Sequence, residues 1–227
     1  MIADAIKQLR TERSITQKEL ADILGVSRNT VVLLEKGERD LTVEEAKTLS
    51  RVLGIRVEAL SGGQMPDFEK YKQIILFILS LTGGDGRIPK TKLAKILYLA
   101  DFTHFYHTME SMSGMQYRKI QYGPVPDEFF RALEELEWEH LINVEIKEKE
   151  EYVTHLVSLT DGGKAADVDQ VSGSEKSLLR KIMKKWENKS TRDIIGFTHQ
   201  QLPYKLAFEG EFIRYSLIGQ EEEKNLY

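Results

Sequence analysis

The sequence predicts a mainly α-helical protein with a small β-hairpin, in which a five-helix bundle precedes a larger α+β, mostly helical domain. Three observations lead to this prediction. Apolar residues recur at helical spacing behind capping residues through most of the chain. A Gly- and Pro-containing linker over 62–67 separates residues 1–61 from residues 68–220. Two alternating, β-branched runs within residues 141–159 are typical of an antiparallel hairpin.

Residues 1–61 are expected to form the five-helix bundle. The first helix covers about Ile2–Arg13 and carries an apolar stripe. The second and third helices lie within Thr16–Lys36. The fourth covers Val43–Leu53 behind the capping residue Thr42, and a short last helix over Val57–Leu60 closes the bundle.

The segment Thr16–Lys36 contains two short helical patterns joined by a tight turn. Thr16 and Glu19 have the spacing of a capping box, and Gly25 suits the left-handed end of the first helix. Ser27 can cap the second helix. Two helices with a Gly-containing turn of about three residues between them form a helix-turn-helix. We therefore expect the first helix to be packed and the second to be presented to a partner.

The order ITQKELADILGVSRNT followed by LEKGERDLTVEEAKTLSRVLGI resembles the Xre/Cro/repressor family of helix-turn-helix domains over residues 3–60. The resemblance implies a DNA-binding domain. It implies that Gln17, at the start of the second helix, braces a phosphate or a neighbouring side chain. The expected DNA-binding residues are Gln17, Ser27, Arg28, Asn29, Thr30, Leu33 and Lys36.

The chemistry of these residue types agrees with DNA contact. Arg28 can pair with guanine O6 and N7, and Asn29 with adenine N6 and N7. Ser27, Thr30 and the helix N-terminus can hold a phosphate.

Two features favour the alternative that this domain only dimerises or docks to protein. Val32 and Leu33 place apolar groups where such domains usually carry polar or basic ones. Residues 1–61 hold 10 Lys and Arg against 10 Asp and Glu, and the whole chain has a net charge of −4. DNA binding would therefore depend on a local arrangement of charge, because affinity scales with the phosphates neutralised.

The second domain is expected to begin with helices over about Phe68–Leu81 and Pro89–His107, followed by a short strand over Tyr117–Tyr122. A helix from Asp127 to about Glu139 comes next. A hairpin of Leu141–Ile146 and Tyr152–Leu159 is expected around the charged tip Lys147–Glu151, followed by a turn over Thr160–Gly163. Two more helices are expected, one capped by Ser174 and reaching about Asn188, and one capped by Ser190 and reaching about Gln200. The tail over 221–227 is expected to be frayed.

Three pieces of this domain suggest a second family. They are KLAKILYLADFTHFY (92–106), YGPVPDEFFRALEEL (122–136) and FTHQQLPYKLAFEGEFI (197–213). Their order resembles the Panacea domain, also called SocA-like, of bacterial and phage antitoxins, over about residues 68–218. This chain has Tyr204 where the family commonly has Trp. The residues matching the family signature or expected at a toxin-binding site are Tyr98, Asp101, Phe105, Tyr122, Gly123, Pro124, Val125, Phe129 and His199.

The residues permit two interpretations of this set. Asp101, among apolar neighbours on a helix, would need a partner if buried, and Tyr98, Tyr122 or His199 could supply one. A satisfied core network is the favoured interpretation. Alternatively, an interaction surface is built around Tyr98, Asp101, Phe105, Tyr122 and Phe129. The prolines at 124 and 126 fix the approach to the next helix.

The sequence indicates neither an enzyme nor a membrane protein. It has no cysteine, so disulfides and thiolate metal sites are excluded. The longest apolar run, Ile74–Leu79, is too short to cross a bilayer. His104 and His107 have a metal-compatible spacing, but no ligand set completes a site. No nucleotide loop or G-x-S-x-G motif is present. We expect no catalytic residue, metal or cofactor, and a cytoplasmic location.

The resemblances imply an antitoxin that neutralises a co-encoded protein toxin and represses its own operon, as a homodimer on operator DNA. The alternative is an Xre-family transcriptional regulator whose C-terminal domain senses a ligand or oligomerises. A third possibility, an enzyme or adaptor with a vestigial helix-turn-helix, would need a titratable cluster in a cleft.

Overall fold

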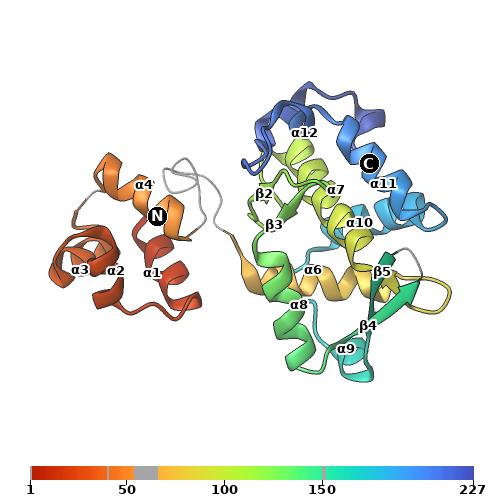
Figure 1. Cartoon of the computed structure of the whole chain (residues 1–227), viewed down its shortest axis with the longest axis horizontal. Coiled ribbons are helices and arrows are strands. Elements are labelled where there is room, and N and C mark those ends of the chain that lie inside the picture. The colour runs from red at the N-terminus through yellow and green to blue at the C-terminus, as the bar shows by residue number, and fades with distance from the viewer. Residues whose placement is uncertain (1, 40, 54–65, 150–151) are drawn as a thin grey trace. The chain divides into compact units, whose positions relative to one another are not determined.

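The computed structural model describes residues 2–39, 41–53, 66–149 and 152–227. The chain divides into two compact units, Met1–Met65 and Pro66–Tyr227 (Figure 1). The helix expected over Val57–Leu60, the glycines of the expected linker and the last two residues of the hairpin tip lie outside the described residues. Each unit is mainly helical, which confirms the predicted fold class.

The first unit contains the helices α1 (Ile2–Glu12), α2 (Gln17–Leu24), α3 (Arg28–Lys36) and α4 (Val43–Leu53). The residues predicted to cap or end its helices do so. Thr16 and Glu19 form a capping box at the start of α2, and Gly25 ends that helix at φ +67°. Ser27 caps α3. The helices meet around a small apolar core of Ile6, Leu20, Ala21, Val31 and Leu49.

The second unit is built around one central helix. Its helices are α6 (Phe68–Ser80), α7 (Lys90–Thr108), α8 (Glu128–Trp138), α9 (Asp161–Ala165), α10 (Gly173–Trp186), α11 (Thr191–Gln200), α12 (Leu202–Leu206), η1 (Tyr215–Gln220) and η2 (Glu223–Asn225). Helix α7 packs against α6, α10, α11 and η1 (Figure 1). All residues from Leu93 to Thr103 are buried, because neighbours cover every side of this helix. No helix in the described part of the chain is long and apolar enough to span a membrane.

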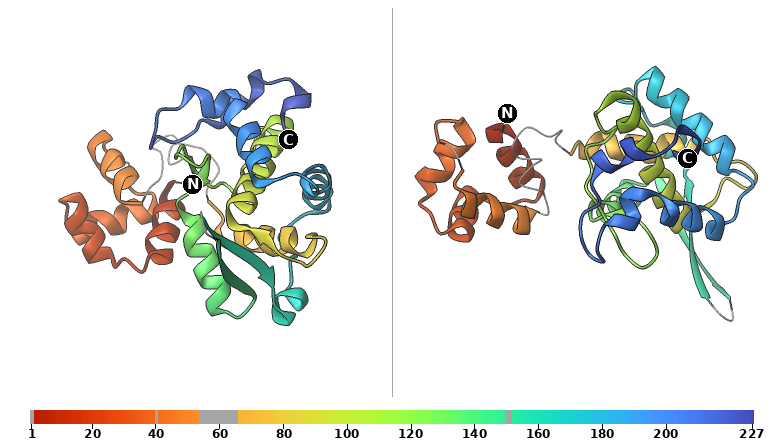
Figure 2. Two further views of the ribbon diagram at one scale, coloured as in Figure 1. Left: turned by 45° about the vertical axis from the view of Figure 1, so that its right-hand side comes forward. Right: turned by 90° about the horizontal axis from the view of Figure 1, so that it is seen from above.

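A three-stranded antiparallel sheet lies beside these helices, with the order β1 (Ile88–Pro89), β5 (Tyr152–Leu159), β4 (Ile142–Lys149). The predicted hairpin is confirmed, with Val144 opposite Val157. The far end of the hairpin extends beyond the helices (Figure 2). A second ribbon pairs β2 (Tyr117–Arg118) with β3 (Val125–Pro126), so the strand predicted over Tyr117–Tyr122 is shorter than expected.

Local details of three predictions were wrong. Ser172, not Ser174, caps α10, because only Ser172 stands three residues before Glu175 and exchanges capping hydrogen bonds with it. The expected turn over Thr160–Gly163 is the start of α9, with Thr160 as its N-cap. Pro89 pairs with β5 as part of β1, so α7 begins at Lys90.

The tail expected to be frayed over 221–227 is packed onto the unit. Leu226 is completely buried, and its carbonyl accepts hydrogen bonds from Thr103 at 3.2 Å and from Gln201 at 3.1 Å. Gln201 also donates to the carbonyl of Asn225 at 2.7 Å. These contacts with α7 and the end of α11 hold a segment whose polar composition predicted disorder.

Candidate DNA-binding and partner-binding sites

Helix α3 presents one face and buries the other. Val31 and Leu34 are buried in the first unit. The structure places every expected DNA-binding residue at an accessible or partly accessible position: Ser27, Arg28, Asn29 and Lys36 are exposed, and Gln17, Thr30 and Leu33 are half-buried. Val32 is half-buried as well. The accessible face is therefore made of the side chains with base-reading chemistry.

The side chain of Ser27 is occupied by capping. It accepts a hydrogen bond from the backbone N–H of Thr30 at 3.1 Å, and the two hydroxyl groups are 2.9 Å apart. The N–H groups of Arg28 and Asn29, in the same first turn, have no partner within the helix. They remain the groups best suited to hold a phosphate at this end of α3.

A chain of hydrogen bonds behind α3 orients Arg28. Arg10 of α1 donates to the buried carboxylate of Glu35 at 2.5 Å. The Gln17 side chain donates to the same carboxylate at 2.8 Å, and its oxygen accepts from Arg28 at 3.3 Å. Burial alone would raise the pKa of Glu35, but the hydrogen bonds from Arg10 and Gln17 outweigh burial and lower it. Gln17 is thus held with its carbonyl oxygen toward Arg28.

Arg10 and Glu35 were not predicted from the sequence. A signal was present, since Glu35 shares the buried helical spacing of Val31 and Leu34. A carboxylate at a buried position requires a charged or hydrogen-bonding partner. The sequence does not say which of the unit's basic residues supplies it.

Some basic residues of the first unit are neutralised within it, and others on α3 are not. Arg10, Arg39 and Lys47 form ion pairs with carboxylates of the same unit. Arg28 and Lys36 form no ion pair with the described residues and are exposed on α3. A neutral unit can therefore present local positive charge, which contact with phosphates requires.

In the second unit, Asp101 belongs to a core network. It accepts hydrogen bonds from the backbone N–H of Ser113 at 2.7 Å, from the Ser113 hydroxyl at 2.5 Å and from the Tyr117 hydroxyl at 2.7 Å. Burial raises the pKa of Asp101 despite these bonds. The favoured interpretation of a satisfied core network is confirmed. The expected partners, Tyr98, Tyr122 and His199, are replaced by residues of the segment that follows α7.

The alternative interaction surface around α7 does not form. Tyr98, Asp101 and Phe129 are buried, and Phe105 packs against the core. Only Tyr122 is largely exposed, at 64%. Aromatic residues at helical spacing on α7 face neighbours on all sides, so they form core and not surface.

The three segments of the Panacea-like pattern meet at one place, which we call the Lys95 cluster (Lys95, Gly123, Pro124, His199, Tyr204). The Lys95 ammonium group is buried and donates to the carbonyl of Pro124 at 2.9 Å. It forms no ion pair with a described carboxylate, and burial lowers the pKa of Lys95 to about 7. The ring of His199 stacks on that of Tyr204 at 4.3 Å.

Gly123 allows this close approach. Its φ of +92° is a conformation that favours glycine, and a Cβ atom there would lie 2.7 Å from Cε of Lys95 and 3.1 Å from Nε2 of His199. That Nε2 atom is buried without a hydrogen-bond partner among the described residues. Burial, followed by the charges of Lys95 and Lys119, lowers the pKa of His199.

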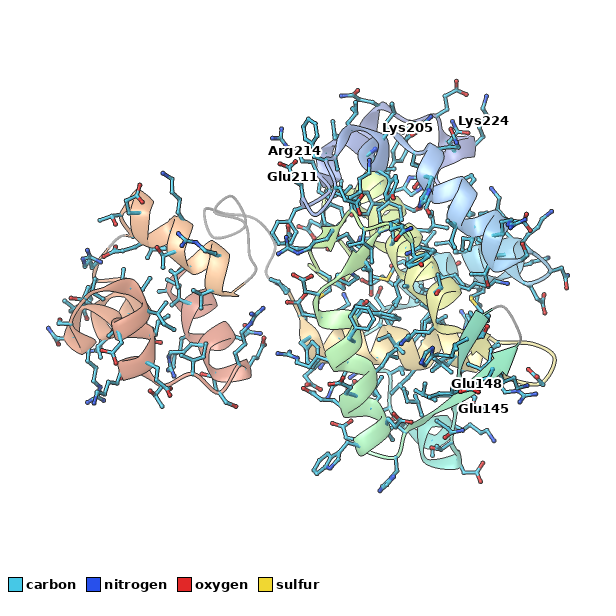
Figure 3. The ribbon with its side chains drawn as sticks, viewed as in Figure 1. Glu145, Glu148, Lys205, Glu211, Arg214 and Lys224 are labelled. Atoms are coloured by element: carbon cyan, nitrogen blue, oxygen red, sulfur yellow. The ribbon has the colours of Figure 1, made fainter. Side chains whose placement is uncertain are left out.

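An apolar rim of Tyr122, Leu206 and Phe208 lies on the two segments beside the Lys95 cluster. All three are exposed, Phe208 at 76%. Backbone hydrogen bonds from Lys119 to Glu211 and from Gly210 to Lys119, at 2.9 and 2.8 Å, join the two segments. The labelled side chains of Lys205, Glu211 and Arg214 lie at the outer surface of this end of the unit (Figure 3). Val125 lies inward, in β3.

No group of three His, Asp or Glu side chains within the described residues is arranged to hold a metal ion. His104, one of the pair with metal-compatible spacing, has its ring nitrogen Nδ1 2.8 Å from the carbonyl oxygen of Glu110.

Two family descriptions match this chain. Residues 6–60 match the family described as helix-turn-helix, and residues 93–204 match the family described as antitoxin SocA-like, Panacea domain. The phage CTXphi transcriptional repressor RstR of Vibrio cholerae is 34% identical over 82 residues, which cover 36% of this chain and 74% of that protein. A helix-turn-helix regulator of Methanocaldococcus jannaschii is 36% identical over 53 residues, covering 23% of this chain and 80% of the regulator.

A prophage-derived regulator of Bacillus subtilis, YonR, is 24% identical over 98 residues, which cover 43% of this chain and 91% of that protein. No solved structure matches the chain. The fold of α1 to α4 with its accessible α3, and the meeting of the signature segments at the Lys95 cluster, agree with the two matched descriptions. The chain belongs to the helix-turn-helix transcriptional regulators of the Xre type and carries a SocA-like Panacea domain after its DNA-binding domain.

Proposed function

We propose that this protein is an antitoxin that binds and neutralises a co-encoded protein toxin through its second unit and represses its own operon through α3. Neutralisation is steric or allosteric and involves no bond chemistry by this chain. The observation that carries the proposal is the meeting of three distant signature segments beside an exposed apolar rim, in a chain whose α3 also exposes Arg28 and Asn29.

On the DNA side, Arg28 reads guanine, and Asn29 reads adenine in the major groove. Gln17 holds the Arg28 guanidinium, which reduces the side-chain freedom lost on binding. Leu33 is half-buried at the accessible face and suits contact with a thymine methyl group. Two copies bind two half-sites of an operator, as helix-turn-helix dimers do.

On the toxin side, the apolar rim is the contact surface, and the Lys95 cluster below it holds the rim segments in place. Exposed aromatic residues are enriched among the residues that dominate binding energy. The Tyr204 hydroxyl donates to the carbonyl of Ile120 at 3.0 Å, and the Lys119 ammonium donates to the carbonyl of Ala207 at 2.9 Å. These bonds support the backbone under Tyr122 and Phe208.

The test co-expresses the full chain with the product of the adjacent gene and measures growth, complex formation and binding to the DNA upstream of the pair. Replacing Tyr122 and Phe208 by Ala is expected to abolish growth rescue and complex formation but to leave DNA binding unchanged. Trp138→Ala is the matched control, because Trp138 is 83% exposed on α8, away from the rim segments. Continued rescue by the rim variant, or an equal loss of rescue in the control, would contradict the proposal.

Replacing Arg28 and Asn29 by Ala is expected to have the opposite effect, abolishing specific operator binding while toxin neutralisation continues. Arg51→Ala, an exposed change on α4, is its control. Unchanged operator affinity in the double variant would refute the assignment of α3 as the reading helix.

The ligand-sensing alternative would need an effector pocket. A cavity of about 220 Å³ lies between the start of α7 and the end of α10, lined in part by Lys92, Met183 and Trp186. Pockets for metabolite-sized ligands usually measure about 300–1,000 Å³. A harmless adjacent gene product, together with operator release by a metabolite, would favour this alternative over the antitoxin.

A further inference from the structure

Strand β4 has an outer edge that the described residues leave largely unpaired. In the sheet, β5 lies between β1 and β4, so β4 is an edge strand over all 8 of its residues. The other edge of the sheet is different, because β1 pairs with β5 at Leu156 and Val157. The far end of the hairpin extends away from the helices (Figure 2). An exposed strand edge is a template for pairing with another strand.

One hydrogen bond shows which backbone groups of β4 point outward. The N–H of Val144 donates to the Glu137 carboxylate of α8 at 3.1 Å, on the side away from β5. Outward and inward groups alternate along an antiparallel strand. The N–H groups of Ile146 and Glu148 therefore point outward as well. Helix α8 covers the edge at Val144, and from Ile146 onward no described residue pairs with it.

The sheet face on this part of the hairpin carries two exposed apolar side chains, Ile146 opposite His155 and Val153 opposite Glu148. Ile142 and Val157 of the same face are buried at the base of the hairpin. Farther out, that face continues with Ile146 and Val153, which are 60% and 56% exposed. An exposed apolar side chain on an unpaired strand, Ile146, would be covered if a second strand lay beside it.

The charges of β4 select a second copy of the same strand. When two β4 strands run antiparallel with Ile146 at the two-fold axis, each Glu145 lies opposite a Lys147 of the other copy. Such directly opposite pairs place their Cβ atoms about 4.5–5.5 Å apart, and opposite charges there are stabilising. The labelled Glu145 and Glu148 side chains extend from the hairpin (Figure 3).

Strand pairings with the two-fold axis at Glu148 or at Val144 would be less favourable than pairing with the axis at Ile146. An axis at Glu148 would place two Glu148 side chains opposite each other, and like charges in that position are destabilising. An axis at Val144 would centre the pairing where α8 covers the edge, whereas with the axis at Ile146 only the outer Val144–Glu148 pairs reach the N–H that donates to Glu137, and there the second strand has to take over that N–H. An axis at Ile146 uses an outward-facing N–H and carbonyl on both strands.

We infer that two copies of this chain pair through the outer edges of β4, antiparallel and centred on Ile146. The inference goes beyond the proposed function, because the pairing needs neither toxin nor DNA. It supplies the homodimer that an operator with two half-sites requires.

Cysteine trapping tests the register directly, because the chain has no cysteine. In Ile146→Cys, the two opposite Cα atoms would be about 5.5 Å apart, within the range that a disulfide spans. Mild oxidation of the full-length variant is expected to give a covalent dimer. Val153→Cys is the matched control, since Val153 lies on the same face with similar exposure. Its two copies would be three strand spacings apart across the sheet, at least about 14 Å, and are expected to stay unlinked.

Charge reversal tests the same contact by sedimentation equilibrium. Glu145→Lys or Lys147→Glu alone places like charges opposite each other twice per dimer and is expected to weaken dimerisation about tenfold. The double variant restores opposite charges and is expected to recover the wild-type dimer. Because Glu145 also accepts from Arg87 at 2.7 Å, thermal unfolding of each variant checks that the fold is intact.

Equal cross-linking of the two cysteine variants, or no recovery in the double charge variant, would overturn the inference. It would also be overturned if the chain were monomeric and Ile146→Lys removed toxin binding, because the edge would then belong to the toxin.

Discussion

Lys95 buries a positive charge with no carboxylate paired to it among the described residues, and replacing it with Met should change stability in a pH-dependent way. Met has a similar length and no charge. The substitution removes the ammonium group and leaves the carbonyl of Pro124 without its donor. The predicted change in the free energy of unfolding is the gain from removing the buried charge minus the cost of the unpaired carbonyl.

The magnitude follows from the pKa. Burial lowers the pKa of Lys95 from 10.5 to about 7. At about 1.36 kcal/mol for each pKa unit, keeping the charged form buried costs about 5 kcal/mol. An unsatisfied buried carbonyl costs about 1–3 kcal/mol. At pH 6 the Lys95→Met protein should therefore be more stable than the wild type by about 2–4 kcal/mol.

The pH dependence has a definite sign. Between pH 7 and pH 10.5 the unfolded state binds more protons at this position than the folded state, so the free energy of unfolding of the wild type rises with pH. Below pH 7 both states hold the proton and the full cost is present. The wild type should gain about 3 kcal/mol between pH 7 and pH 9.5. The variant should lack this gain and lose its advantage by pH 9.5.

Urea unfolding followed by tryptophan fluorescence measures this effect. Both tryptophans, Trp138 and Trp186, belong to the second unit, so the first unit does not contribute. The series stops at pH 9.5, because the pKa of buried tyrosines such as Tyr117 lies well above 10 and tyrosine ionisation in the unfolded state would lower stability at higher pH. Lys181→Met, at an exposed position of α10, is the control.

Two results would refute this reasoning. One is a wild type whose free energy of unfolding is constant from pH 7 to pH 9.5. The other is a Lys95→Met protein that is less stable than the wild type at pH 6, which would mean that the ammonium group is stabilised by a partner in the native state.

Three further substitutions test the arrangement of buried groups. Gly123→Ala should lower the free energy of urea unfolding by more than about 1 kcal/mol, because of its positive φ and the approach to Lys95; a neutral effect would contradict the close packing. Asp101→Asn should cost about 1–3 kcal/mol in the same assay, since an amide cannot accept all three hydrogen bonds. Glu35→Gln should destabilise the first unit by about 3 kcal/mol in thermal unfolding followed by circular dichroism and should weaken operator binding, whereas the exposed change Glu44→Gln should do neither. In the wild type, the stabilisation by Glu35 is present above pH 4.5 and is lost as acid protonates its carboxylate.

Elements set by short-range interactions were predictable. The capping box of Thr16 and Glu19, the left-handed Gly25 and the cap by Ser27 are contacts over a few residues, and their spacing can be read directly. The misplaced cap of α10 was readable too, since Ser172 and Glu175 have the same capping-box spacing. The accessible face of α3 followed from helical periodicity in the same way.

The frayed tail and the partners of Asp101 were predicted wrongly for a common reason. Leu226 is buried because it packs against α7 and the end of α11, and nothing within residues 221–227 indicates this packing. Asp101 selects Ser113 and Tyr117 because the segment after α7 folds back over it. Such contacts depend on how distant segments pack.

By itself, the sequence determined the helix-turn-helix, the residues proposed to contact DNA, the hairpin and the three signature segments, because each rests on periodicity, capping or residue type over short distances. Only the tertiary structure decided which of these residues face solvent. It buried α7 on every side, brought Lys95, Gly123 and His199 together, and left Tyr122 and the outer edge of β4 exposed. The physical reason is that the burial of a side chain depends on every segment packed around it. Segments far apart in the chain leave no periodic pattern in the sequence that would indicate this packing.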